Sequence, residues 1–369
     1  MKRYALLTVA VMLCIDAIAI SQPAHAQTTP PLTVAQSAPA ANTEQINDLL
    51  RRGRELVDAG DYAGAITLYQ QAATLEPDNA RIYSGIGFLQ TRQGNFQAAI
   101  ASYQQAIAIE DDNANFFYAL GFSRANLGDY AGAEQAYERA SQLDPNNVEA
   151  LLGLGVVRTR QQNYAAAIDA YRRVIALRPN DSQSYEFLGA AYIQQDNFAE
   201  ATNVLQRAAQ LAPRRGSILV NLGIALINQG NIEEGLAALE RASDLEPRNG
   251  QIHLQVGNIL RVGGDTDRAL TYYRRAISAN PSNAEPHARQ GEIYLERENY
   301  IEAIVALRQA TELSPQDADA HYHLGLALKG RERTEEAIAE LQQARTLYQQ
   351  QGNTEGIANV DAALQNGRR

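Results

Sequence analysis

The sequence predicts an all-α fold, an α-solenoid of tandem helix–turn–helix units, on three observations. Glycine recurs nine times at one unbroken 34-residue period. Within each interval, apolar residues stand three, four or seven positions apart, which places them on one face of a helix. Proline and Gly-Asp or Gly-Asn pairs separate these runs, where one helix is expected to end and the next to begin. The glycines are Gly53, Gly87, Gly121, Gly155, Gly189, Gly223, Gly257, Gly291 and Gly325.

Residues 1–26 have the pattern of a secretory signal peptide. A basic pair precedes an apolar run from Tyr4 to Ile15, and small residues stand on both sides of a histidine at 24–26, as at a cleavage site. We expect cleavage before Gln27. An uncleaved membrane anchor is the alternative. Asp16 disfavours it, because it interrupts the run before the roughly 18 residues that a spanning helix needs.

The cysteine usage agrees with export. Cys14 is the only cysteine, and it lies within the predicted signal peptide. A lipoprotein signal is disfavoured because Leu13, rather than a small residue, precedes Cys14. A mature chain without thiols suits an oxidising compartment and has neither a disulfide nor a cysteine-ligated metal. We therefore expect a bacterial protein of the periplasm or another extracytoplasmic compartment, with no membrane span after cleavage.

Residues 27–45 are expected to form a flexible linker. Threonine, proline, alanine and glutamine dominate this segment, and residues 27–43 carry no charge. Such a composition offers no apolar face to bury. A targeting or docking role for the segment is the alternative.

From Ile46 onward, each 34-residue unit is predicted to hold two amphipathic helices. An alanine follows the glycine by twelve positions in every unit but one, and a tyrosine or leucine follows it by sixteen. The small residues let two helices approach, and the large residue fills the space opposite. A single hairpin cannot bury its apolar face alone, whereas a stack of hairpins can. The large residues are Tyr69, Tyr103, Tyr137, Tyr171, Leu205, Leu239, Tyr273, Leu307 and Leu341.

Turn and cap residues recur at the same period. Glycine can take the left-handed conformation that ends a helix, and the Asp or Asn after it can cap the next helix. Proline closes most units, and an Asn or Asp after it can cap the following unit. The glycine turns are Gly60-Asp61, Gly94-Asn95, Gly128-Asp129, Gly230-Asn231 and Gly264-Asp265, and the unit caps are Asn79, Asn147, Asp181, Asn249, Asn283 and Asp317.

This pattern closely resembles the tetratricopeptide repeat (TPR) family over residues 46–351. The resemblance implies a right-handed superhelix in which the first helix of each unit lines the concave inner surface and the second faces outward. Residues 352–369 are then predicted to hold a capping helix, Thr354–Gln365, because the last unit needs a polar outer cover. The nine units are 46–79, 80–113, 114–147, 148–181, 182–215, 216–249, 250–283, 284–317 and 318–351.

The sequence contains no pattern for catalysis, a cofactor or a metal. It lacks a GxxxxGK[ST] phosphate loop, and Lys329 is the single lysine of the repeats. Gly85-x-Gly87 and Gly153-x-Gly155 lie within predicted helices with no strand before them, so we interpret them as packing glycines. The net charge of −10 argues against nucleic acid or anionic lipid as a partner. We therefore expect a protein that is not an enzyme.

Histidines recur at one slot in three successive units, at His253, His287 and His321, with His323 nearby. A metal or pH-sensing ladder would need them to converge, but neighbouring helix axes stand about 8–10 Å apart, whereas zinc holds nitrogens at about 2.0–2.1 Å. The same slot carries tyrosine, phenylalanine or leucine in other units. We therefore expect these histidines to be packing residues.

The inner surface is the best candidate for function. In the architecture that the resemblance implies, it is lined by first-helix residues on the face away from the packing glycine. The partner-binding residues expected there are Arg51, Arg54, Phe88, Arg92, Tyr118, Phe122, Asn126, Arg160, Phe187, Asn221, Asn258, Arg261 and Arg289, with Gln194, Asn228, Glu292 and Tyr322 beside them.

Phe88, Tyr118 and Phe122 fall in adjacent units and are expected to form one exposed apolar strip with arginine at its ends. Exposed aromatic patches mark binding surfaces. The alternative is that these rings pack on one another. Two known kinds of TPR groove fit poorly. Clamps for a C-terminal carboxylate use several lysines, and asparagine ladders repeat one slot, whereas here Asn221 stands alone at its slot.

We therefore expect a scaffold or adaptor that binds a protein or peptide on its concave face in the cell envelope. Three alternatives stay open. They are a docking subunit of a polysaccharide, pilus or outer-membrane assembly, a self-associating spacer, and a recruiting arm of an enzyme, for which no segment remains to hold a catalytic domain.

Overall fold

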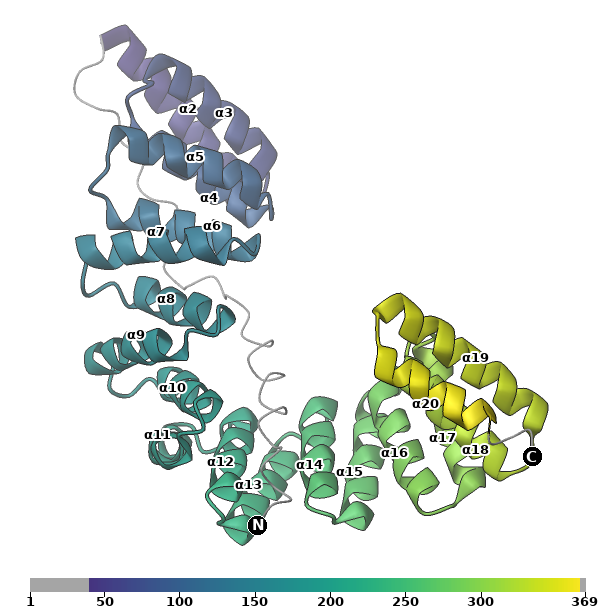
Figure 1. Cartoon of the computed structure of the whole chain (residues 1–369). Helices are drawn as coiled ribbons and strands as arrows, with labels where there is room; N and C mark the ends of the chain where they lie inside the picture. Colours follow the sequence, from purple (N-terminus) through teal and green to yellow (C-terminus); the bar gives the residue numbers. More distant parts are fainter. Residues whose placement is uncertain (1–39, 366–369) are drawn as a thin grey trace. The chain divides into compact units, whose positions relative to one another are not determined.

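The computed structural model describes residues 40–365, and every regular element within that range is an α-helix (Figure 1). The nineteen helices, α2 to α20, follow one another as hairpins. The predicted all-α solenoid is therefore confirmed. None of the described helices combines the length and apolar character needed to cross a membrane. The predicted signal peptide, 1–26, and residues 27–39 of the predicted linker lie outside the described residues.

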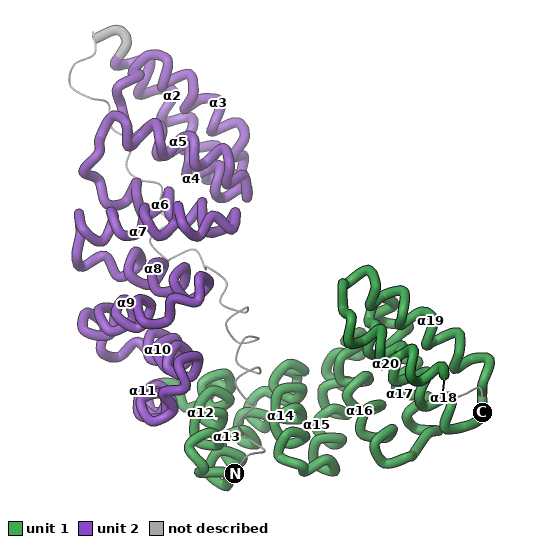
Figure 2. The backbone as a smooth tube through the Cα atoms, in the orientation of Figure 1, with its two compact units in different colours: residues 1–10, 212–369 green, residues 11–211 purple. Residues whose placement is uncertain are grey.

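The chain divides into two compact units, which are coloured separately in Figure 2. The described part of unit 2 spans 40–211 and contains five hairpins. Its helices are α2 (Ala40–Asp58), α3 (Tyr62–Leu75), α4 (Ala80–Arg92), α5 (Phe96–Ile109), α6 (Ala114–Asn126), α7 (Tyr130–Leu143), α8 (Val148–Arg160), α9 (Tyr164–Leu177), α10 (Ser182–Gln194) and α11 (Phe198–Leu211).

The described part of unit 1 spans 212–365 and contains four hairpins and a final helix. Its helices are α12 (Gly216–Asn228), α13 (Ile232–Leu245), α14 (Gly250–Val262), α15 (Thr266–Ala279), α16 (Ala284–Glu296), α17 (Tyr300–Leu313), α18 (Ala318–Gly330), α19 (Thr334–Gln351) and α20 (Thr354–Gln365).

The first helix starts earlier than predicted. α2 begins at Ala40, so residues 40–45 belong to a helix and not to the linker expected over 27–45. Alanine is the strongest helix former, and composition alone counted the alanines of this segment as linker residues. The apolar face of α2 begins with the fully buried Ile46, which is where the sequence pattern first became visible.

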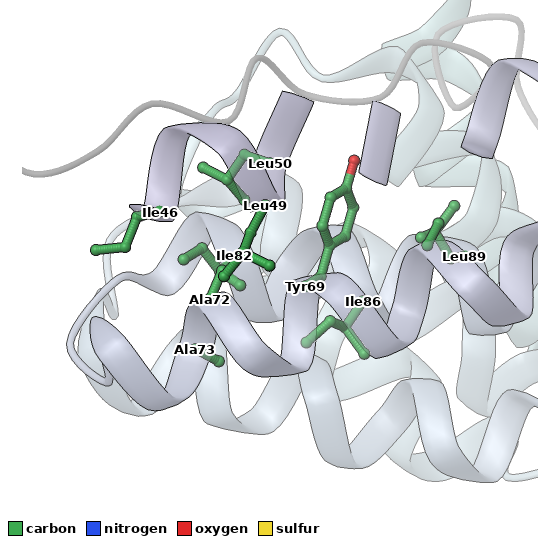
Figure 3. Packing of buried hydrophobic residues seen from close by; sticks show 10 residues of the cluster. Ile46, Leu49, Leu50, Tyr69, Ala72, Ala73, Ile82, Ile86 and Leu89 are labelled. Carbon is green, nitrogen blue, oxygen red and sulfur yellow. The ribbon is translucent and has the colours of Figure 1, made fainter. Parts of the chain in front are cut away.

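The packing role of the periodic glycines is confirmed. A Cβ atom added at Gly53 would lie 2.2 Å from the Tyr69 ring, and one at Gly189 would lie 2.4 Å from Leu205. The large residue of each hairpin therefore occupies the space that the glycine leaves. Figure 3 shows Tyr69 among apolar side chains from α2, α3 and α4, which together form one core cluster.

The turns inside the hairpins follow one conformation. Gly60, Gly94, Gly128, Gly230 and Gly264 all have positive φ, as predicted. The other four hairpins lack glycine at this position and still adopt it. There Gln162, Asp196, Glu298 and Glu332 have φ of 61°, 55°, 57° and 58°. These residues bear the strain that glycine avoids.

The caps between hairpins are confirmed, and those within hairpins are confirmed in part. Every predicted unit cap accepts a hydrogen bond from a backbone N–H of the following helix. Asp61, Asp129 and Asp265 do the same within their hairpins. Asn95 and Asn231 make no such bond. The Asn95 amide donates instead to Gln93, at 3.2 Å.

First helices lie on the inner side of each unit. Among helices that are not consecutive in the chain, the closest contacts join first helices of neighbouring hairpins. These pairs are α4 with α6 and α6 with α8 in unit 2, and α12 with α14 and α16 with α18 in unit 1. Second helices stand farther apart. A stack whose first helices crowd together bends toward them, so their uncovered side is the inner face of that unit.

The predicted capping helix is present as α20. It covers an apolar cluster that includes Leu347, Tyr348 and Val360. The Lys329 ammonium donates to the carbonyl of Ala363 at 2.7 Å, which caps the carboxyl end of α20. The only lysine of the repeats therefore holds the end of the stack rather than a ligand.

Candidate functional site

The inner faces are described by three slots, which we call the inner slots. They are positions 51, 54 and 58 of the chain and the equivalent positions in every later first helix. Most of the predicted binding residues occupy these slots. Arg261 stands one position before its inner slot, and Tyr118 stands one position before Ala119.

In unit 2, the best-defined group on the inner face joins Tyr62, Phe88 and Arg92. Tyr62 begins α3, whereas Phe88 and Arg92 stand one turn apart on α4. The Arg92 guanidinium lies 5.9 Å from the centre of the Tyr62 ring and donates to its hydroxyl at 3.3 Å. Phe88 and Tyr62 are half-buried against the same core cluster, and Arg92 is exposed. The group presents aromatic rings beside a positive charge.

The same arrangement recurs one repeat later with Phe96, Phe122 and Asn126. The rings of Phe96 and Phe122 meet edge to face, with centroids 6.3 Å apart. Phe122 is only 6% exposed, because Phe96 covers it. The predicted exposed strip is therefore wrong at Phe122, whose ring packs on Phe96, a residue outside the predicted strip. The Asn126 amide donates to the Phe122 carbonyl at 2.8 Å and is itself exposed.

Two further aromatics lean on the buried tyrosines of the core. The rings of Tyr118 and Tyr137 lie 5.9 Å apart, and those of Phe187 and Tyr171 lie 5.6 Å apart. Burial, reinforced by the charge of Glu149, raises the pKa of Tyr118, so this phenol stays neutral. Tyr118 and Phe187 are both half-buried and keep part of each ring at the surface.

The charges at the inner slots of unit 2 are mainly positive. They are Arg51, Arg54, Arg92 and Arg160, against the single acidic residue Asp58. Arg51 pairs with Asp48 and Glu55 on its own helix, at 2.5 and 2.6 Å.

The arginines of this face differ in their surroundings. Arg54 donates to the Leu50 carbonyl and stays exposed. Arg160 is half-buried beside Tyr171. Burial raises the pKa of that phenol, and the hydrogen bond between Tyr171 and Thr159 and the charge of Arg160 oppose the rise.

The inner face of unit 1 is polar. Asn221 is 2% exposed, and its Oδ1 has no hydrogen-bond partner. Asn258 accepts from the hydroxyl of Tyr273 at 2.8 Å, and the Asn228 amide donates to the Ile224 carbonyl at 2.9 Å. The amides of Asn258 and Asn228 therefore bond within their own hairpins.

The charged residues of unit 1 pair with one another. Glu292, 8% exposed, accepts from Arg261 on the preceding first helix and from Arg289 on its own, the latter at 3.0 Å. Arg261 also reaches Glu296 at 2.9 Å. Nδ1 of His323 stands 3.9 Å from Glu292. Arg261 and Arg289, both predicted as binding residues, therefore neutralise carboxylates of their own chain.

The histidine slot packs as predicted, with hydrogen bonds that the sequence did not show. Nε2 of His253 faces the Pro247 carbonyl at 3.0 Å, and Nε2 of His321 faces that of Pro315 at 3.2 Å. Nδ1 of His321 stands 2.6 Å from Glu340. Within the described residues, no cluster of three or more His, Cys, Asp or Glu side chains is arranged to hold a metal ion.

The sequence interpretation missed the aromatic residues that begin the second helices. Tyr62 and Phe96 stack against inner-face residues, and Tyr130 and Tyr164 occupy the same slot in the next hairpins. The signal was available, because an aromatic follows each turn Asp or Asn at the same 34-residue period throughout unit 2. In unit 1 the slot holds Ile232, Thr266, Tyr300 and Thr334.

A hollow of about 360 Å³ lies elsewhere in unit 2, among α3, α4 and α5. It contains none of the predicted binding residues, and no charged side chain lines it. Its lining residues are Gln70, Ala73, Thr74, Pro77, Tyr83, Ile86, Ser102 and Gln105.

Family models match most of the described chain. The model described as the Cilia and flagella-associated protein 70 C-terminal domain matches residues 9–251. Models described as tetratricopeptide repeat match residues 220–284 and 318–351, and one described as TPR repeat matches 291–330. No curated protein matches the sequence.

Several solved structures are similar. A tetratricopeptide repeat protein from Parabacteroides merdae is 20% identical with a TM-score of 0.52, over 64% of this chain and 94% of that one. MamA is 24% identical with a TM-score of 0.45, over 47% and 94%. YrrB, a TPR protein described as having an unusual peptide-binding site, is 20% identical with a TM-score of 0.46, over 50% and 95%. At these identities the likeness concerns the fold alone.

Proposed function

Because the chain belongs to the tetratricopeptide repeat family, we propose that it is a non-catalytic adaptor that binds a protein or an extended peptide on the inner face of unit 2. The fold itself suggests a scaffold for protein–protein interaction. The finer assignment rests on one observation. Half-buried aromatic rings and arginines gather on that face, with Phe88 and Arg92 at its best-defined point.

The inner face of unit 1 offers a ligand little to gain. Its arginines already pair with Glu292 and Glu296, and Asn258 is bonded to a core tyrosine. Groups that satisfy each other gain little from a ligand, because binding must first break the existing bonds.

We place the adaptor in the cell envelope of a bacterium. This location rests on the signal-like pattern of residues 1–26 and on the lack of cysteine after Cys14. Fractionation of cells that express the tagged full chain tests it. Recovery of a shortened chain in the periplasmic fraction supports the proposal, and recovery of the full-length chain in the cytoplasm contradicts it.

Capture from an envelope extract tests the binding face. Replacing Phe88 by alanine removes a half-buried ring without touching the packing glycines, and binding hot spots are typically aromatic. We expect Phe88→Ala to lose partners that the wild type and the outer-face control Arg207→Gln retain. Equal capture by all three proteins removes the inner face of unit 2 from the proposal.

A self-associating spacer is a second candidate, because unit 1 carries an unusual apolar pair on its outer side. Ile301 and Val305 on α17 are 58% and 67% exposed. In the other hairpins the equivalent positions hold alanine or polar residues. Light scattering against concentration tests this role. Association that Val305→Glu abolishes supports the spacer, and a monomer at every concentration rejects it.

A further inference from the structure

We infer that the hollow among α3, α4 and α5 of unit 2 receives an arginine side chain from a basic segment of another protein. None of the inner slots lines this hollow, so the inference goes beyond the proposed function. The hollow has a volume of about 360 Å³ and uncharged walls. They combine the ring of Tyr83, the amides of Gln70 and Gln105, and the hydroxyls of Thr74 and Ser102.

The hollow follows from the identity of one residue, Gln105. We call its position on the second helix, and the equivalent position in every other hairpin, the arginine slot. Glutamine is shorter than arginine and lacks the planar cation, so it leaves uncovered a space that arginine would fill. Ala73 and Ile86, which belong to the core cluster of Figure 3, line the apolar side of that space. In the next five hairpins the arginine slot holds Arg139, Arg173, Arg207, Arg241 and Arg275.

Two arginines of unit 2 show where a guanidinium from this slot lies. The Arg139 guanidinium stands 5.8 Å from the centre of the Phe117 ring, and Phe117 occupies the position that Tyr83 holds one hairpin earlier. Arg207 donates to the side-chain oxygen of Asn180 at 3.4 Å, in the turn after the preceding second helix. A guanidinium therefore covers the aromatic ring in one hairpin and reaches the preceding turn in another.

Two arginines of unit 1 reach the same surroundings. Arg241 donates to the carbonyl of Pro213 at 3.2 Å. Arg275 donates to the Ser243 hydroxyl at 3.3 Å and stands 3.9 Å from Asp244. The equivalents of Pro213, Ser243 and Asp244 in unit 2 all line the hollow. The chain's own arginines thus occupy, in other hairpins, the space that is hollow beside Gln105.

The charges around the hollow favour a cation. Asp78, in the turn after α3, is exposed and forms no ion pair within the described residues, and its equivalent is the residue that accepts from Arg207. Thr74 belongs to the last turn of α3, where the helix dipole is negative and cations are stabilised. The cation nearest to Asp78 in the sequence, Arg81, already has a partner.

These walls fit arginine better than lysine. A guanidinium is flat and weakly hydrated, so it can stack on the Tyr83 ring while its edge donates to neighbouring oxygens. Gln70, Gln105, Thr74 and the Pro77 carbonyl supply such oxygens. A lysine ammonium is a compact, strongly hydrated charge and uses this arrangement less well. The net charge of −10 attracts a basic partner and repels a second copy of this chain, which favours another protein as the source.

Fluorescence anisotropy with labelled synthetic peptides tests the inference on the full chain. The reference probe is a serine–glycine peptide that carries three arginines. One further probe replaces the arginines by lysine and keeps the charge, and another replaces them by citrulline and keeps the shape. We expect the arginine probe to bind most tightly, the lysine probe about fivefold more weakly because it stacks less well, and the citrulline probe most weakly of all.

Matched variants assign the site. Gln105→Arg supplies the arginine that the following hairpins already carry, and we expect it to weaken binding of the arginine probe about tenfold. Tyr83→Leu removes the stacking ring and should also weaken binding. The fold accepts this change, since Leu151 and Leu219 stand at the same position. The control, Gln309→Arg, adds the same charge at the arginine slot of α17 in unit 1 and should bind like the wild type. Circular dichroism confirms that all three variants are folded.

Several outcomes overturn the inference. They are absence of binding by the wild type, equal binding of the arginine and lysine probes, and equal weakening by Gln105→Arg and Gln309→Arg. Self-association that Gln105→Arg abolishes would place an arginine of a second copy in the hollow and would contradict the assignment to another protein. Phe88→Ala should leave binding of the arginine probe unchanged. Weakening by that variant would move the probe to the inner face, which overturns this inference and leaves the proposed function standing.

Discussion

The two units share one packing scheme and differ in what their inner faces display. Unit 2 shows half-buried aromatic rings beside arginines, whereas unit 1 shows amides and charges that pair with one another. The core slots are alike, since Gly121 meets Tyr137 as Gly257 meets Tyr273. The core packing positions therefore determine how the hairpins stack in both units. The inner slots are not needed for this packing, so their residues can differ and can serve binding.

A single slot shows how far the units diverge. At position 54 and its equivalents, unit 2 holds Arg54, Phe88, Phe122, Val156 and Ala190, and unit 1 holds Ile224, Asn258, Glu292 and Leu326. The first residue of the second helix differs too, since it is aromatic in every hairpin of unit 2 and in unit 1 only at Tyr300. At the start of the second helix, Phe96 in unit 2 packs on Phe122, whereas Thr266 in unit 1 accepts a hydrogen bond from Arg297.

Removing the capping helix α20 should give the largest difference in stability between the two units. Deleting residues 353–369 uncovers Leu347 and Tyr348, at a cost of roughly 3–6 kcal/mol for two large buried side chains. Repeats contact mainly their neighbours, so unit 2 should hold its stability. Calorimetry should resolve an early transition of unit 1. An unchanged, single transition would contradict the role assigned to α20.

Next come substitutions that test whether the core slots are equivalent. Gly121→Ala places a Cβ 2.8 Å from the Tyr137 ring, and Gly257→Ala places one 2.6 Å from the Tyr273 ring. We expect each to lower the free energy of unfolding by about 1–3 kcal/mol, as overpacking does. Chemical denaturation measures both. A large loss in one unit and none in the other would show that the units do not share their packing.

A pH dependence distinguishes unit 1 further. Both ring nitrogens of His321 face acceptors, Pro315 and Glu340, an arrangement that favours the protonated ring. The hydrogen bond to Glu340 is the main cause that raises its pKa, against burial. Its stabilisation is complete below about pH 6.5, the usual histidine pKa, and is lost as the pH rises through the raised value.

His287 works in the opposite direction. Burial lowers its pKa, so stability is lost as the pH falls below about 6.5 toward the lowered value. Thermal unfolding of His321→Gln and His287→Gln against pH separates the two histidines. The first variant should lose the stabilisation present at acidic pH, and the second should gain stability there. The reverse pattern would contradict the hydrogen bonds assigned to His321.

The smallest effect concerns the turns without glycine. Gln162→Gly in unit 2 and Glu298→Gly in unit 1 relieve a left-handed conformation, and each should raise the unfolding free energy by about 0.5–1 kcal/mol. Gly128→Ala, at an equivalent turn, serves as the opposite control. A loss of stability in the first two variants would show that these side chains are needed for another reason.

Periodicity determined most of the fold in advance. Gly53 and its equivalents, the unit caps and the helix Thr354–Gln365 stand where the sequence placed them, because each depends on neighbours close in the chain. The start at Ala40 was missed because alanine suits both a linker and a helix.

The site was less predictable. Whether Phe122 is exposed depends on Phe96, and whether Arg261 is available depends on Glu292, on the next first helix. Such pairs join different hairpins, and their contact is decided by stacking geometry rather than by local pattern. The aromatic slot at Tyr62 and Phe96 could have been found, since it has the same period as the glycines.

The most direct test of the account is amide hydrogen exchange of the full chain with and without a partner captured from an envelope extract. The account predicts added protection in α4, α6 and α8, whose residues form the inner face of unit 2, and unchanged exchange in α14, α16 and the second helices. Protection centred on α14 and α16, or on α17, would contradict the division of roles between the two units.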